Sequence, residues 1–108
     1  MELTKAGKKA AREIIETGLL NEFKQGLQAA AAIIHEWENT NGDNREYYHS
    51  LFSNISDFNK HIARRYDYMK SSDYLLIIAA QLNDGVISEA DISILPEEAR
   101  QAIERIRS

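Results

Sequence analysis

The short segment at residues 39–44, with the sequence Asn-Thr-Asn-Gly-Asp-Asn, decides the fold because it separates two long stretches of helical periodicity. Asparagine, glycine and aspartate are typical of turns, and Asp43 or Asn44 can cap a helix that follows. Two helices joined by so short a turn run antiparallel. The sequence therefore predicts a helical hairpin.

The segment before this turn, residues 4–39, is the first predicted helix. It contains no proline, and from Leu20 to Trp37 its apolar residues recur every three or four positions. Gly18 and Gly26 each weaken the helix by about 1 kcal/mol relative to alanine. They mark a bend, a frayed first segment or a close helix crossing, and the sequence leaves these three alternatives open.

The segment after the turn is a second predicted helix of some twenty residues. Its apolar positions, spaced by three or four, are Tyr48, Leu51, Phe52, Ile55, Phe58, Ile62, Tyr66 and Met69. This spacing is typical of one buried helix face. It therefore predicts that the rings of Tyr48 and Tyr66 belong to the core.

The last third of the chain is predicted to be a cluster of short helices. Asp73 can cap a helix over residues 74–80 that is apolar on every side, which indicates burial all round. A last helix begins at Pro96, a residue favoured in the first turn. We expect one all-α domain, with a long antiparallel hairpin at residues 1–70 and a helical head at residues 71–108.

The length of the first predicted helix indicates that the hairpin projects from the head. A helix of about 36 residues is about 54 Å long, whereas a globule of this chain length is only about 34 Å across. Projecting apolar stripes stay in water unless something covers them, and the commonest cover is the same surface of a second copy. We therefore expect a homodimer that pairs through the hairpin. The predicted interface residues are Leu27, Ile34, Leu51, Ile55, Phe58 and Ile62.

Composition excludes several classes of function. The 108 residues contain no cysteine, which excludes disulfides, thiolate zinc sites, iron–sulfur clusters and thiol nucleophiles. No apolar run approaches the roughly 20 residues of a membrane helix, and the start of the chain lacks the apolar block of a signal peptide. We expect a cytoplasmic protein without membrane insertion. The net charge is −4 and the strongest basic cluster is a single turn at Lys60, Arg64 and Arg65, so nucleic-acid binding is not expected.

One pair of residues has the spacing of metal ligands. Glu46 and His49 match the Glu-x-x-His pattern of di-iron helical bundles, but the pattern occurs once and the full site needs two such pairs. A solvated helix start with Glu46 near the positive end of the helix dipole explains both residues better. No serine, histidine and acid combination resembles a catalytic triad either. We expect no enzyme activity, metal or cofactor.

Two motifs in the second half of the chain resemble a known family. Residues 61–68 read His-Ile-Ala-Arg-Arg-Tyr-Asp-Tyr, and residues 80–91, after an apolar helix, read Ala-Gln-Leu-Asn-Asp-Gly-Val-Ile-Ser-Glu-Ala-Asp. Together with the preceding hairpin they are similar to the fluorescence recovery proteins of cyanobacteria, over about half of the chain. Members of that family are helical homodimers that bind the photoactivated orange carotenoid protein. They release it from the light-harvesting antenna and speed its return to the resting form.

The resemblance implies a non-enzymatic protein that binds a carotenoid-binding photoreceptor protein. The family's tryptophan, histidine, aspartate and arginine on helix two fall on His49, Phe52, Ser53 and Asn59 here, so none is retained. An aromatic residue of the family's partner face falls on Ile77. The predicted partner-binding residues are Arg64, Tyr68, Ile77, His49 and Phe52. The alternative function is a helical interaction module with an unrelated protein partner.

Overall fold

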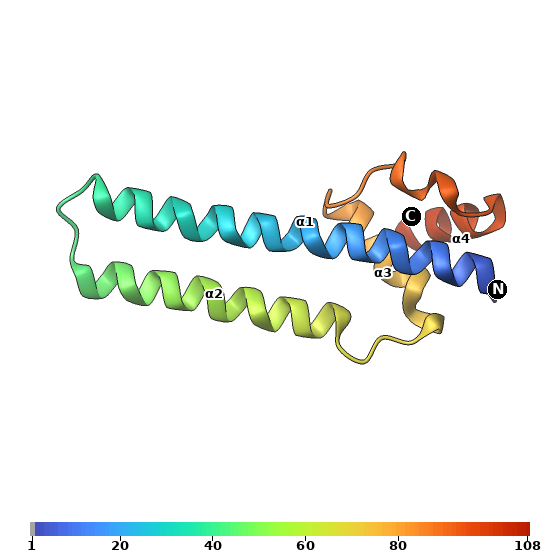
Figure 1. Ribbon diagram of the computed structural model, residues 1–108, viewed down its shortest axis with the longest axis horizontal. Coiled ribbons are helices and arrows are strands. Elements are labelled where there is room, and N and C mark those ends of the chain that lie inside the picture. Colours follow the sequence, from blue (N-terminus) through green and yellow to red (C-terminus); the bar gives the residue numbers. More distant parts are fainter. Residues whose placement is uncertain (1) are drawn as a thin grey trace. The chain divides into compact units, whose positions relative to one another are not determined.

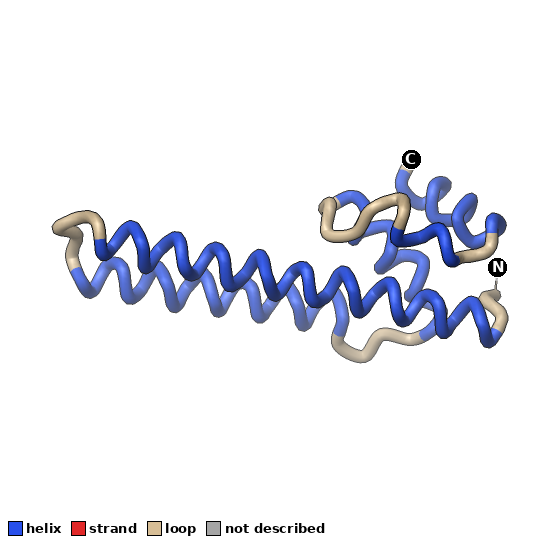
Figure 2. The backbone as a smooth tube through the Cα atoms, turned by 45° about the horizontal axis from the view of Figure 1, so that its top comes forward, coloured by secondary structure: helices blue, strands red, loops and turns tan. Residues whose placement is uncertain are grey.

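The structure, a computed structural model, describes residues 2–108, and these residues form helices without any strand (Figure 2). The elements are α1 (Lys5–Glu38), α2 (Asn44–Tyr66), the 3₁₀ turn η1 (Ser71–Asp73), α3 (Tyr74–Asn83), the 3₁₀ turn η2 (Asp91–Ile94) and α4 (Glu97–Arg107). The predicted all-α class is confirmed, with one long helix followed by shorter ones.

The chain divides into two compact units. The first combines the described residues up to Glu22 with Tyr68–Ser108, and the second is Phe23–Asp67. The second unit ends close to residue 70, where the sequence placed the end of the hairpin. The first part of α1, however, belongs to the same unit as the C-terminal helices, because it carries the buried residues Ala11, Ile14 and Ile15.

The first unit has an apolar core of its own. Its α3 helix packs against α4 and η1 (Figure 1). Because α3 is apolar on nearly every side, it supplies the centre of this core, and Ile78 is fully buried. The other buried aliphatic residues are Ala11, Ile14, Ile15, Ile77, Ala79, Leu82, Val86, Ile87, Ile92, Leu95, Ala99 and Ile103.

A glycine of α1 makes room for a buried polar side chain in this core. Gln81 of α3 is fully buried, and its Nε2 donates a hydrogen bond to the Ile15 carbonyl oxygen at 3.0 Å. A Cβ atom on Gly18 would collide with the amide of Gln81.

A second glycine of α1 lies against an aromatic ring in the second unit, where a Cβ on Gly26 would come within 3.1 Å of the Phe58 ring. Both glycines therefore make room for a side chain of another helix, whereas a close crossing of the helix backbones stays a prediction.

The second unit is the predicted hairpin, in which α2 returns antiparallel to the last part of α1 (Figure 1). The side chain of Asp43 caps α2 by accepting a hydrogen bond from the Arg45 backbone N–H at 2.8 Å. Phe23 and Phe58 pack edge to face between the two helices, with ring centroids 5.7 Å apart. The turn residues at positions 39–44 thus correctly predicted where α1 ends and where α2 begins.

Two neighbouring residues of α3 test which side chains form the core of the first unit. Ile77 is 7% exposed and Leu76 is 56% exposed. We expect Ile77→Ala to lower the free energy of unfolding by about 2–5 kcal/mol, because it leaves a cavity in packed surroundings. The matched change Leu76→Ala should cost less than about 1 kcal/mol. Denaturant titration at one fixed protein concentration measures both, and equal losses would show that α3 does not pack as described.

Candidate functional site

The second unit leaves large apolar side chains in water on both of its helices. Leu27 on α1 is 73% exposed, and Phe52 on α2 is 63% exposed. The other exposed large apolar residues of this unit are Phe23, Ile34, Trp37, Tyr48 and Ile55. Large exposed apolar patches are typical of interaction sites, so this surface is the candidate site of the protein.

Helical spacing places five of these side chains on one face of the hairpin. Leu27 and Ile34 are seven residues apart, which is close to two turns, so they lie on the same side of α1. On α2, Tyr48, Phe52 and Ile55 follow one another at intervals of four and three. The two stripes meet, because Ile34 and Tyr48 line one pocket. We call these five residues the apolar face.

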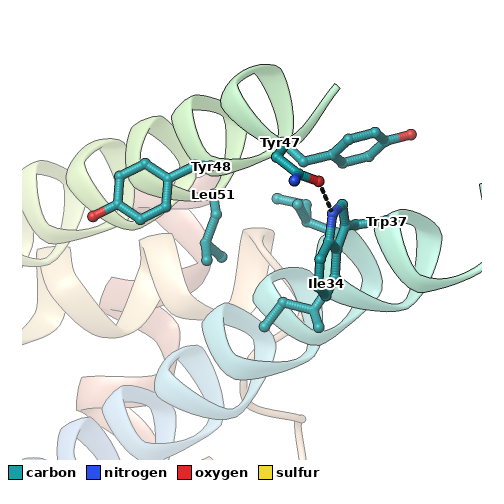
Figure 3. Close-up of a pocket in the computed structure, with 7 residues that line it drawn as sticks. Ile34, Trp37, Tyr47, Tyr48 and Leu51 are labelled. Atoms are coloured by element: carbon teal, nitrogen blue, oxygen red, sulfur yellow. Dashed lines mark hydrogen bonds between the residues drawn. The ribbon is translucent and has the colours of Figure 1, made fainter. Parts of the chain in front are cut away.

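A pocket of about 420 Å³ opens on this face near the turn (Figure 3). Its lining residues are Ile33, Ile34, Trp37, Asn44, Tyr47, Tyr48 and Leu51. The indole Nε1 of Trp37 donates a hydrogen bond to Asn44 Oδ1 at 2.8 Å, which ties the end of α1 to the start of α2. The Tyr47 hydroxyl donates to Glu36 Oε1 at 3.2 Å. None of the lining residues is charged, so this tip pocket suits an apolar side chain.

The six predicted interface residues fall into two groups. Leu27, Ile34 and Ile55 are exposed, whereas Leu51, Phe58 and Ile62 are half-buried. Phe58 contacts Phe23 and faces Gly26, so it belongs to the packing within the hairpin.

The burial predicted for two tyrosines is right for one of them. Tyr66 is 8% exposed, but Tyr48 is 69% exposed, so its assignment to the core is wrong. The physical reason is that two helices bury only the strip between them, and Tyr48 lies beside that strip.

Four of the five predicted partner-binding residues are accessible, and one is not. His49, Phe52, Arg64 and Tyr68 are exposed. Ile77 is buried, which corrects the expectation that it contacts a partner. The residue lies on the side of α3 that belongs to the core of the first unit. Leu76, the preceding residue, is the exposed apolar group on this helix.

Tyr68 combines unusual exposure with an unusual backbone. The residue is 95% exposed, and its φ angle is 60°, in the left-handed region that bulky residues rarely adopt. A strained residue persists where its surroundings hold it, and such residues cluster at functional sites. The geometry therefore keeps Tyr68 among the candidate contact residues.

A groove on the first unit was missed by sequence reasoning. It has a volume of about 460 Å³. Its apolar lining is formed by Leu3, Leu75, Leu76, Ala102 and Ile106, and its polar lining by Glu2, Lys8, Ser71, Ser72 and Arg105. These residues come from three separate parts of the chain, so no single periodic pattern could reveal that they share one surface. The only local signal is the amphipathic pattern of α4.

The structure also bears on metal and membrane sites. Within residues 2–108, no group of three or more histidine, aspartate or glutamate side chains is arranged to hold a metal ion. Glu46 and His49 are both exposed near the start of α2. None of the helices in this described part combines the length and the apolar character needed to cross a bilayer.

Comparison with known proteins gave no match, whether with protein-family models, with curated proteins or with solved structures. The apolar face and its tip pocket are therefore the basis on which we infer function.

Proposed function

We propose that this chain is a non-enzymatic helical binding protein that works as a homodimer. The observation that supports this proposal is the exposed apolar face of the second unit, with Leu27 and Phe52 mostly in water. Removing one large apolar side chain from water contributes about 1.5–3 kcal/mol. In a two-fold interface every such residue counts twice, so this face can supply a large part of the free energy of dimerisation.

A second copy suits the apolar face better than a small ligand. The face extends over about two turns of each helix, from Leu27 to Ile34 and from Tyr48 to Ile55, whereas the tip pocket occupies only its turn end. Two hairpins that meet face to face form a four-helix bundle, which buries all four stripes in one core. The interface would be isologous, because each copy contributes the same surface.

For the partner, we propose a carotenoid-binding photoreceptor protein whose return to the resting form this protein accelerates. The support is the resemblance of residues 61–68 and 80–91 to the fluorescence recovery proteins, together with the order of a long helix, a turn and shorter helices. Arg64 and Tyr68 are exposed residues of the first motif, and arginine and tyrosine are common anchors of protein interfaces.

A second candidate is a helical interaction module with an unrelated protein partner. The specific observation that favours it is the replacement of the four family residues on helix two, a tryptophan, a histidine, an aspartate and an arginine. At these positions the chain has His49, Phe52, Ser53 and Asn59, and all four are exposed. The chain therefore keeps the hairpin but presents different side chains on α2 to a partner.

The homodimer predicts a clear effect of Ile55→Glu. Ile55 is 45% exposed in the single chain, so a glutamate there can remain solvated in a monomer. In the dimer the same carboxylate would lose its water, at a cost of several kcal/mol. Sedimentation equilibrium should show a dimer for the unaltered chain and a folded monomer for Ile55→Glu.

The matched control is Ser50→Glu, which adds the same charge about 140° around α2 from Ile55. Ser50 is exposed, and the variant should remain dimeric. A dimeric Ile55→Glu, or a monomeric unaltered chain at tens of micromolar, would contradict the proposed interface.

The proposed partner predicts binding that depends on Arg64 and Tyr68. A purified orange carotenoid protein should bind the unaltered chain after illumination, and its resting absorbance should recover faster in the dark. Arg64→Ala combined with Tyr68→Ala should abolish the acceleration and leave the dimer intact. Arg12→Ala, a change at another exposed arginine, is the control and should leave the acceleration unchanged.

The absence of binding at tens of micromolar would contradict this partner, because an interaction of about −6 kcal/mol is still detectable there. That result would leave the interaction module with an unrelated partner as the function.

A further inference from the structure

Charged side chains of the second unit are segregated toward its two ends. The turn end, residues 30–52, carries Glu36, Glu38, Asp43 and Glu46, with Arg45 as its one lysine or arginine. The open end, residues 23–29 and 53–67, carries Lys24, Lys60, Arg64 and Arg65, with Asp57 and Asp67 as its acids. The net charge is −3 at the turn end and +2 at the open end when histidine is neutral. Two copies in antiparallel orientation therefore place opposite charges together, whereas a parallel pair places like charges together.

The shape of the apolar face also differs between the turn end and the open end of the hairpin. At the turn end lies the tip pocket of about 420 Å³, lined on α1 by Ile33, Ile34 and Trp37. Toward the open end, Leu27 protrudes with 73% of its surface exposed. In a parallel pair both tip pockets would lie at the same end of the bundle. In an antiparallel pair each tip pocket faces the end from which Leu27 of the other copy protrudes.

The residues of α1 between Leu27 and the tip pocket are small enough to lie at the centre of an antiparallel pair. If Leu27 of one copy lies level with Ile34 of the other, the two-fold axis passes midway between them, at Ala30 and Ala31. These residues belong to the run of alanines at residues 29–32. The distance between packed helix axes is about 8–10 Å and depends on the side chains in contact, so alanine permits the closest approach at the axis.

We propose that two copies pair in antiparallel orientation through the apolar face, with Leu27 of each copy inserted into the tip pocket of the other. The site is then incomplete in a single chain, since the second copy supplies the group that fills the pocket. This inference rests on the proposed homodimer and adds its orientation and the occupant of the pocket.

The test uses the absence of cysteine, because one introduced cysteine carries one spin label per chain. Asn41 lies in the turn and is exposed, so Asn41→Cys places the label at the turn end. In the antiparallel dimer the two labels should be about 30 Å apart, because each lies about ten residues from the axis at 1.5 Å per residue. In a parallel dimer the turn ends lie side by side, and the labels should be within about 20 Å, given the spacing of packed helices.

The matched control is Gln28→Cys, an exposed position close to the proposed axis and about 100° around α1 from Leu27, so that its label lies beside the interface. A measurable distance between its labels shows that the labelled chains are dimeric. A Gln28→Cys distance shorter than the Asn41→Cys distance supports the antiparallel pair. An Asn41→Cys distance within about 20 Å would overturn the orientation and leave the proposed homodimer standing. If neither variant gives a dipolar distance and both sediment as monomers, the homodimer and the orientation are overturned together.

Discussion

A pair of helices has only one contact strip, and this constraint governs the second unit of the molecule. The strip is filled by the edge-to-face packing of Phe23 and Phe58 and by the approach of Phe58 to Gly26. Apolar residues beside the strip, such as Leu27 and Phe52, are left mostly uncovered by the described residues 2–108. The apolar face, the tip pocket and the proposed pairing of two copies all follow from this shortage of partners.

The first unit does not share the constraint, because three other segments contribute to the core around its central helix, α3. These segments are residues 2–22, η2 and α4, and Ile78 of α3 is fully buried among them. The hydrogen bond from Gln81 to the Ile15 carbonyl oxygen, at 3.0 Å, adds a polar link between α3 and α1. The chain thus joins a unit with its own core to one that offers apolar surface for binding.

Much of the fold could be predicted from local signals, and much of the site could not. The turn residues 39–44 and the periodic runs on both sides gave the helix bounds, because capping and turn chemistry act within a few residues. Tyr48 and Ile77 were misassigned because periodicity identifies an apolar stripe without showing what covers it. The groove around Leu76 and Ile106 joins distant segments, which only the tertiary structure brings together.

The central claim is that the second unit needs a second copy to bury its apolar face. Amide hydrogen exchange of the unaltered chain, followed by mass spectrometry during dilution, tests this most directly. Exchange in residues 23–67 should quicken as the dimer dissociates, while exchange in α3 should stay slow because its core lies within one chain. Exchange in residues 23–67 that stays equally slow in a chain sedimenting as a monomer would contradict the claim.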